Sequence, residues 1–164
     1  MKLRPLTAPD RRPLERLLAA TAAFNAADVA VALELIDDIL AKGEHSDYRA
    51  VCAEAEAEAL AGFICFGRIP LTEASFDLYW IVVGPNHQGR GVASRLLAAI
   101  EPVCSQAGGT QLFAETSSLD AYAPARAFYE ATGFHLVSRI PDFYAPGNDR
   151  LTYAKRLGGA SLVA

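Results

Sequence analysis

Cysteine and histidine are scarce in this sequence, with three of each among 164 residues. Cys52, Cys65 and Cys104 lie far apart and show neither the Cys-x-x-Cys spacing of a redox motif nor the paired spacing of a zinc ribbon. The histidines are equally scattered, so no group of residues has the spacing of metal ligands. We therefore expect reduced, mostly buried thiols and no bound metal.

Long apolar runs and clusters of basic residues are also absent. No stretch reaches the roughly 18 apolar residues of a membrane-spanning helix, and the amino terminus, MKLRPLTAPDRR, lacks the apolar core of a signal peptide. The formal net charge of −4 excludes a dominant, non-specific attraction to nucleic acid or to an acidic membrane. We expect a soluble cytoplasmic protein that binds neither.

The sequence does have the apolar content of a globular protein, because 52% of its residues are hydrophobic and 21% are charged. A chain of 164 residues is long enough to bury a core and fits one domain. We expect a single domain over residues 1–164, present as a monomer or a homodimer.

The spacing of apolar residues alternates between helical and extended along the chain. Helices are expected over 11–23, 26–42, 92–107 and 124–132, the second capped by Asn25 and ended by Gly43. Strands are expected at 2–5, 47–56, 59–69, 75–83, 110–116, 134–139 and 151–155. Strands 47–56, 59–69 and 75–83 suggest an antiparallel meander, and strand 75–83, its following helix and strand 110–116 a right-handed, parallel βαβ unit. The predicted fold class is mixed α/β.

One short stretch, HQGRGVAS at residues 87–94, places two glycines between an apolar strand and a helix. The start of a helix exposes backbone N–H groups and carries positive potential, so glycines there let an anion approach the backbone. An ordinary strand-to-helix turn explains the same glycines. A dinucleotide fingerprint is excluded because Ser94 replaces its third glycine, and a Walker loop is excluded because no Lys follows.

Two motifs in this order resemble the GNAT superfamily of acetyl-CoA-dependent N-acetyltransferases. The family signature [QR]-x-x-G-x-[GA] stands here as Gln88-Gly89-Arg90-Gly91-Val92-Ala93, after the strand end Ile81-Val82-Val83. The second motif, A-x-x-[LFY]-Y-x-x-x-G-F, stands as ARAFYEATGF at residues 125–134. The resemblance covers most of the chain and implies a central, mostly antiparallel sheet with a parallel splayed pair and flanking helices.

The same resemblance implies a site for acetyl-CoA as the cosubstrate. In the family, the backbone at Ile81 to Val83 pairs with the pantetheine arm, and the amides of Gly89 to Ser94 hold the pyrophosphate. Arg90 and Arg95 either add positive charge there or form a solvated helix face. Many members carry Asn where this chain has Tyr122, so no cofactor contact is carried over to that position.

Three residues are candidates for acid–base chemistry. Tyr129 stands where family members place the general acid that protonates the leaving thiolate, and the alternative is a core tyrosine. Glu115 matches the position at which some protein-acetylating members carry their catalytic Glu. Asp77 rests on strand geometry, because alternation places it on one face with Ile81 and Val83. Either carboxylate is a candidate base acting through water, or a strand-edge carboxylate without a catalytic role.

Aromatic residues in late segments are predicted to line the acceptor pocket. They are Tyr122, Phe143 and Tyr144, the last two in segment 140–149, which we expect to be a loop. The predicted acceptor is a primary amine of a small molecule or a peptide N-terminus, which attacks acetyl-CoA directly. The alternative is a catalytically inactive acyl-CoA-binding or sensory domain that retains the glycine loop.

Overall fold

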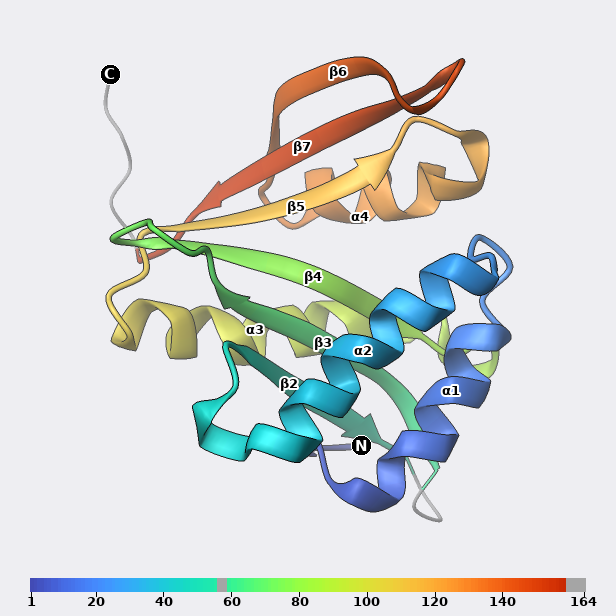
Figure 1. Ribbon diagram of the computed structural model, residues 1–164, viewed down its shortest axis with the longest axis vertical. Helices are drawn as coiled ribbons and strands as arrows, with labels where there is room; N and C mark the ends of the chain where they lie inside the picture. Colours follow the sequence, from blue (N-terminus) through green and yellow to red (C-terminus); the bar gives the residue numbers. More distant parts are fainter. Residues whose placement is uncertain (56–58, 159–164) are drawn as a thin grey trace. The chain divides into compact units, whose positions relative to one another are not determined.

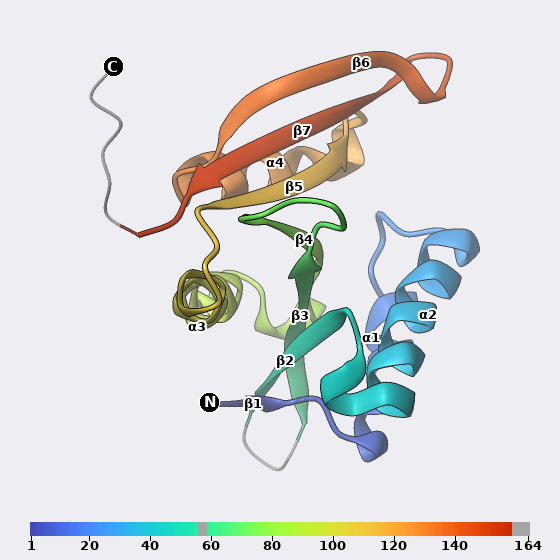
Figure 2. The ribbon, with the colours of Figure 1, turned by 60° about the vertical axis from the view of Figure 1, so that its left-hand side comes forward.

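The computed structural model describes residues 1–55 and 59–158 (Figures 1 and 2). The helices are α1 (Arg11–Ala19), α2 (Ala26–Lys42), α3 (Val92–Gln106) and α4 (Ala123–Ala131), with short 3₁₀ helices η1 (Ala8–Asp10), η2 (Gly43–His45), η4 (Pro85–His87) and η5 (Asp120–Tyr122). The strands are β1 (Lys2–Pro5), β2 (Tyr48–Glu54), β3 (Leu60–Arg68), β4 (Ser75–Val83), β5 (Gln111–Ser117), β6 (His135–Ala145) and β7 (Asn148–Arg156). This order of elements confirms the prediction, except that residue 56 of the expected strand 47–56 lies outside the described residues.

Seven strands form one mixed sheet in the order β1-β2-β3-β4-β5-β7-β6. Strands β4 and β5 are parallel, with Ser75 opposite Gln111 and Leu78 opposite Ala114, as the βαβ prediction required. The mixed α/β class is therefore confirmed. The chain divides into two compact units, unit 1 (Met1–Gly67 and Tyr79–Ile100) and unit 2 (Arg68–Leu78 and Glu101–Ala164), and β4 contributes residues to both.

Unit 1 is built on the antiparallel strands β1, β2 and β3. Helices α1 and α2 cover one face of these strands, and the first part of α3 covers the other (Figure 2). The core on the α1 and α2 side consists of Leu14, Leu17, Leu18, Ala32, Leu33, Ile36, Cys52, Phe63, Cys65 and Val82. Gly62 of β3 has no room for a side chain, because an added Cβ would lie 2.6 Å from the Val82 carbonyl oxygen.

Helix α2 begins and ends at the predicted residues. The Asn25 side chain accepts hydrogen bonds from the N–H groups of Ala27 and Asp28, and the Asp28 carboxylate accepts one from the Asn25 N–H. Gly43 follows the helix with φ of +56°, a conformation that favours glycine. Helix α1 ends at Ala19, earlier than predicted, where the Thr21 hydroxyl donates to the Leu17 carbonyl at 3.0 Å and competes with the next helical N–H for that carbonyl.

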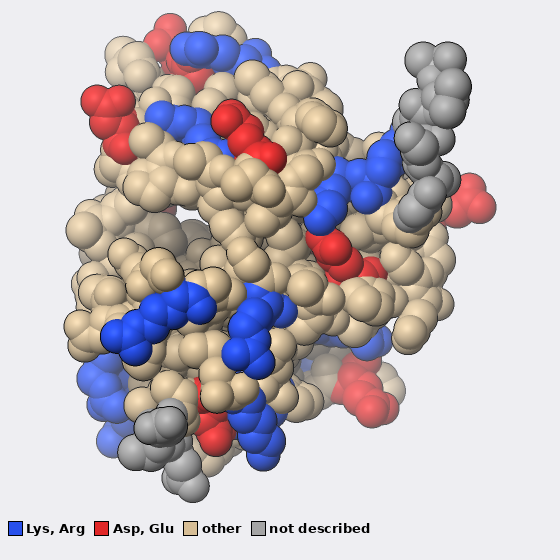
Figure 3. Space-filling view, turned by 180° about the vertical axis from the view of Figure 1, so that it is seen from behind, with Lys and Arg blue, Asp and Glu red and all other residues tan. Residues whose placement is uncertain are grey.

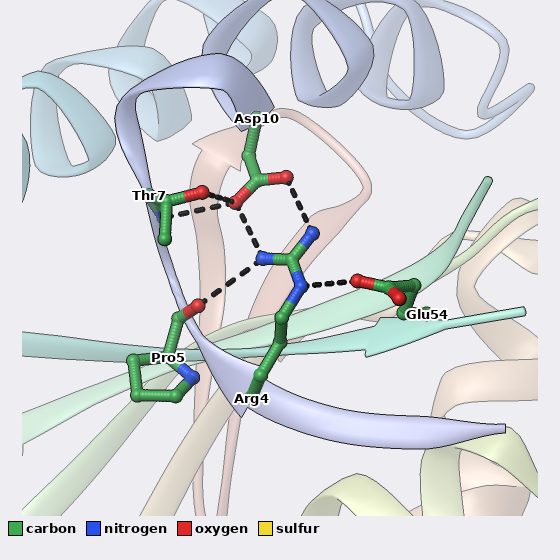
Figure 4. Close-up of polar contacts among 5 residues, drawn as sticks. All are labelled: Arg4, Pro5, Thr7, Asp10 and Glu54. Carbon is green, nitrogen blue, oxygen red and sulfur yellow. Dashed lines mark hydrogen bonds and ion pairs between the residues drawn. The ribbon is translucent and has the colours of Figure 1, made fainter. Parts of the chain in front are cut away.

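A buried ionic cluster joins β1, η1 and β2 in unit 1 (Figure 4). The Arg4 guanidinium donates hydrogen bonds to both carboxylate oxygens of Asp10, at 2.7 and 2.9 Å, and pairs with Glu54. Asp10 also accepts hydrogen bonds from the Thr7 N–H and hydroxyl, at 2.8 and 2.7 Å, and is only 4% exposed. Because every carboxylate oxygen of Asp10 has a donor, its burial does not leave an unpaired charge.

Unit 2 is built on the first half of β4 with β5, β7 and β6. Strand β7 pairs antiparallel with β5 on one side and with β6 on the other. Helix α4 packs on one face of these strands, where the Tyr129 ring lies 5.6 Å from that of Tyr153 and the Tyr153 hydroxyl donates to Glu130. None of the helices within residues 1–55 and 59–158 is both long and apolar enough to span a membrane.

The expectation of a loop at 140–149 is wrong, because β6 extends to Ala145 and β7 starts at Asn148. Pro141 favoured the prediction of a loop, but an edge strand tolerates a residue that has no N–H to donate. The Asp149 carboxylate holds the two strands together by accepting from the Asp142 N–H and from Arg139. Asp142 has φ of +53° within the region of shifted register, so the strand bends without ending.

Candidate active site

The glycine stretch of unit 1 has the predicted strand, loop and helix context. Gly89 and Gly91 have φ of +69° and +73°, and no atom lies within 4 Å of a Cβ added to either. The positive φ at both positions favours glycine, as in an ordinary turn. The open space leaves the backbone before α3 accessible to a ligand. The loop therefore has the backbone conformation of a strand-to-helix turn and also a backbone that is open to an anion, the two explanations that the sequence offered.

Two residues of this loop, His87 and Arg90, line a cavity. An open cavity of about 360 Å³ in unit 1 is lined by Met1, Ala55, Ala59, His87 and Arg90. Figure 3 shows several Lys and Arg side chains gathered in its lower part, where unit 1 is drawn. Arg90 was predicted from the sequence as a cofactor-binding residue, whereas His87 was not, although it lies in the same glycine stretch.

Two side chains fix the loop to its surroundings in unit 1. The Gln88 amide donates to the Val83 carbonyl at 3.3 Å, so the motif glutamine ties the loop to the end of β4. Arg95 donates to the Met1 carbonyl, also at 3.3 Å. Arg95 is exposed and contacts the backbone of the residue before β1, so both explanations of this arginine stay predictions.

The strand segment predicted to meet the cofactor, Ile81 to Val83, lies beyond the last residue of the parallel ladder, Leu78. Val82 is buried, whereas Ile81 and Val83 are half-buried. Asp77 is half-buried too, so the burial along β4 agrees with the predicted alternation of faces.

Asp77 and Glu115 share a face of unit 2. Asp77 lies opposite Phe113 in the parallel ladder, and Glu115 follows Phe113 by two residues, so both side chains project on one side. Burial and, secondarily, the charge of Glu115 raise the pKa of Asp77 to about 6. The Glu115 side chain is itself 49% exposed. The structure thus places the two candidate bases on one face, and the surroundings of Asp77 raise its pKa.

Arg150 of β7, which the sequence reading missed, lies on the same face. It is opposite Ser117, two residues after Glu115, and its Nη1 lies 3.7 Å from the Glu115 carboxylate. The face therefore carries what we call the charged row, formed by Asp77, Glu115 and Arg150. No local signal marks Arg150 in the sequence, because its neighbours come from other strands.

Tyr129 lies on the opposite face of unit 2, with α4. It is 5% exposed and packs against Phe128, Phe134 and Tyr153, with ring centroids 5.4 to 5.8 Å apart. Burial raises the pKa of Tyr129, so its phenol stays protonated at neutral pH. These surroundings suit a core tyrosine, and a protonated phenol is also what a general acid requires.

Two of the predicted acceptor-pocket residues contact each other on β6. The rings of Phe143 and Tyr144 meet edge to face at 5.0 Å, and their exposures are 49% and 48%. The Arg150 guanidinium lies 4.4 Å from the centre of the Phe143 ring, which links this pair to the charged row. Tyr122 belongs to η5, directly before α4.

Metal chemistry finds no support within the described part of the chain, where no three His, Cys, Asp or Glu side chains gather as ligands. All three cysteines are buried. Burial raises the pKa of Cys52 and of Cys65 to about 12, so both remain thiols.

Comparison with known proteins gives two matches over most of the chain. The sequence model of the Acetyltransferase (GNAT) family matches residues 14–134. A solved structure from Desulfovibrio desulfuricans, assigned to the GNAT family of acetyltransferases, is 36% identical; the match covers 96% of this chain and 99% of that one, with a TM-score of 0.91. No curated protein sequence gives a match.

Two other solved structures share the fold at lower identity. An aminoglycoside 6'-N-acetyltransferase complexed with coenzyme A is 18% identical, over 98% of this chain and 99% of that one, with a TM-score of 0.77. The ribosomal-protein-S18-alanine N-acetyltransferase from Escherichia coli is 19% identical, over 99% and 97%, with a TM-score of 0.76. At these identities the likeness concerns the fold alone.

Proposed function

Because this chain belongs to the GNAT family of acetyltransferases and is therefore an acyltransferase, we propose that it moves the acetyl group of acetyl-CoA to a primary amine of a small molecule or a peptide N-terminus. The aminoglycoside enzyme of the same fold was solved with coenzyme A, which supports acetyl-CoA as the donor. The amine attacks directly, without an acyl-enzyme intermediate.

Residues of unit 1 hold the donor in this proposal. The amides of Gly89 to Ser94 bind the pyrophosphate, because the backbone there is uncovered and opens a helix of 15 residues. The backbone of Ile81 to Val83 pairs with the pantetheine arm. Arg90 and His87 line the adjacent cavity and favour an anionic ligand.

Acid–base chemistry falls to residues of unit 2. The amine nitrogen forms a bond to the acetyl carbon as the carbon–sulfur bond breaks, and the nitrogen loses a proton. Asp77 takes this proton through a water molecule, and Tyr129, which approaches from the α4 face of the sheet, gives a proton to the leaving thiolate. Asp77 is preferred to Glu115 as the base, because burial raises the pKa of Asp77 to about 6, whereas the Glu115 side chain is 49% exposed and lies beside Arg150.

The observation that carries this assignment is the place of Asp77. It is half-buried on β4, on the strand face that also carries Ile81 and Val83, and its pKa of about 6 suits a base at neutral pH.

The first prediction separates the two carboxylates. Asp77→Asn should lower kcat/KM by about 10²–10⁴-fold and remove the rise of activity through pH 6, because the deprotonated form of Asp77 accepts the proton. Glu115→Gln should lower the rate less and keep that rise. The measurement is release of free CoA thiol as a function of pH with a panel of amines, after calorimetry shows unchanged acetyl-CoA binding. Equal, small losses would remove both residues from the base role, and no CoA release with any amine would favour the inactive acyl-CoA-binding domain.

A further inference from the structure

Arg150 differs in its partners from two other arginines of unit 2, Arg126 and Arg139. Arg126 donates to the carbonyls of Ser117 and Leu119 at 2.8 Å, and Arg139 donates to Asp149 at 2.6 Å. Each of these guanidinium groups has a firm partner that explains its position in the fold. Arg150 has no comparable contact: its Glu115 neighbour stands at 3.7 Å, beyond hydrogen-bond distance.

The Nε of Arg150 is buried and lacks a hydrogen-bond acceptor, which makes it the one such side-chain atom in the described ranges of the chain. A buried donor without an acceptor is costly, and such a group in a native structure calls for a partner such as a water molecule, an ion or a ligand. The guanidinium is nevertheless held in place, because it lies 4.4 Å from the centre of the Phe143 ring. The side chain is 26% exposed, so a ligand reaches it from solvent.

We propose that Arg150 binds a carboxylate of the acceptor, so that the enzyme selects amines that also carry a carboxylate, as free amino acids and short peptides do. This inference rests on the proposed function. A planar guanidinium binds a carboxylate through two parallel hydrogen bonds, which places the anion and fixes its orientation.

The rest of the charged row fits the other end of such a ligand. Asp77, Glu115 and Arg150 lie on β4, β5 and β7, three neighbouring strands. Asp77 is level with Phe113 and Arg150 with Ser117, so the backbones at the two ends of the row are about 10 Å apart across the strands and about 13 Å apart along them. Glu115 and Asp77 attract an ammonium group, whereas Arg150 attracts a carboxylate. A zwitterion held at Arg150 therefore directs its amine along the row, past Glu115 and toward Asp77, the residue to which we assign the base role, and a peptide reaches farther along the row than a free amino acid.

The aromatic pair adds a second element of selection. Phe143 and Tyr144 are about half exposed and lie beside Arg150, so they offer an apolar surface next to the carboxylate site. Acceptors with an apolar side chain bury that surface and should be preferred over glycine. L-phenylalanine and L-leucine are therefore suitable probes.

The experiment compares acids with their amides. Initial rates are measured for L-phenylalanine and L-phenylalaninamide, for the leucine pair, and for glycyl-phenylalanine with its amide, using wild type, Arg150→Gln and Arg150→Lys. Arg156→Gln is the matched control, because Arg156 is an exposed arginine at the other end of β7, opposite Gln111. The two members of a pair differ in amine pKa, so the acid-to-amide ratio of kcat/KM is compared between proteins and not within one.

Arg150→Gln should lower the acid-to-amide ratio by about 10- to 100-fold, mainly through KM, because it removes charged hydrogen bonds to the carboxylate. Arg150→Lys should retain part of the ratio, and Arg156→Gln all of it. The free amino acid or the dipeptide, whichever gives the larger loss, is the source of the carboxylate. An unchanged ratio in a folded Arg150→Gln variant overturns the inference while leaving acetyl transfer intact.

Calorimetry with L-phenylalanine in the presence of CoA separates this inference from the proposed function. Binding that Arg150→Gln weakens and Arg156→Gln does not, without any acetylated product, would uphold the carboxylate site and contradict the transferase assignment. If Arg150→Gln fails to fold, Arg150→Lys decides: an acid-to-amide ratio equal to that of wild type overturns the inference.

Discussion

Tyr129 shows how one side chain meets two demands. Its ring is part of the aromatic cluster under α4, and its phenol remains protonated because burial disfavours the phenolate. A general acid needs the second property, and the fold needs the first. Substitutions that remove only the hydroxyl therefore distinguish the two roles.

Tyr129→Phe should lower turnover by about 10²–10⁴-fold while acetyl-CoA binding is unchanged, because the ring still packs and only the proton donor is lost. Tyr153→Phe is the matched control, since it removes a hydroxyl from the same cluster. The measurement is the single-turnover rate, which excludes product release as the slow step. Wild-type rates in Tyr129→Phe would make this residue purely structural.

Gly91 offers a second test at this scale. Gly91→Glu should weaken acetyl-CoA binding measured by calorimetry at least about 10-fold, because a negative side chain then faces the phosphates beside α3. Gly91→Ala carries the same strain of a positive φ without the charge and should lose less affinity. Gly147→Glu, at a glycine with φ of +76° in unit 2, should lose stability but not affinity. Unchanged binding in Gly91→Glu would remove the loop from the cofactor site.

Among the elements, those with strong local signals were predicted well. The cap at Asn25, the stop at Gly43 and the alternation along β4 act over a few residues, and the structure has each of them. The β6 and β7 hairpin was predicted too short, because its length depends on Asp149 accepting from Asp142 and Arg139 across the strands. Pairings of this kind leave no mark in a local window of sequence.

The cap of α2 provides a prediction for this scale. Asn25→Ala should lower the free energy of unfolding by about 1 kcal/mol, because two N–H groups of the first turn lose their acceptor. Asn25→Ser should retain most of that stability, since a hydroxyl caps equally well. Urea unfolding followed by circular dichroism measures both variants. Equal stability of the Ala and Ser variants would show that water replaces the cap.

For the molecule as a whole, the sequence predicted the order of elements and the glycine loop but only part of the candidate site. Asp77 and Glu115 were recognised as rivals, whereas the structure shows them on one face with Arg150. That face is assembled from three strands whose neighbours in space are remote in the chain. The register between these strands determines which side chains share the face. Register depends on packing between strands, which cannot be derived from a single sequence.

Acid stability belongs to the same scale, since it depends on the cluster that ties β1, η1 and β2 together. Hydrogen bonds from Arg4 lower the pKa of Asp10 to about 2, below the value of 3.8 expected for the unfolded chain. The pair therefore stabilises the fold fully above pH 4, by about 2 kcal/mol, and this contribution is lost as the pH falls from about 4 to 2.

Asp10→Asn should accordingly lower the free energy of unfolding at pH 7, and the gap to wild type should narrow toward pH 2. Asp120→Asn, at an exposed aspartate, is the control and should change little at either pH. Chemical denaturation at several pH values measures the gap. A gap that stays constant with pH would show that Arg4 does not act on the Asp10 carboxylate.

The burial of all three cysteines decides how this protein can be assayed. Cys52, Cys65 and Cys104 are each at most 1% exposed, so the folded chain presents no thiolate to an aromatic disulfide reagent. Such a reagent added to the reaction would report only the thiol of liberated CoA, continuously and without a background from the enzyme. On denaturation the three thiols of each chain become accessible and react with the reagent. The same colour change therefore measures turnover in the native protein and the amount of unfolded chain in a destabilised variant.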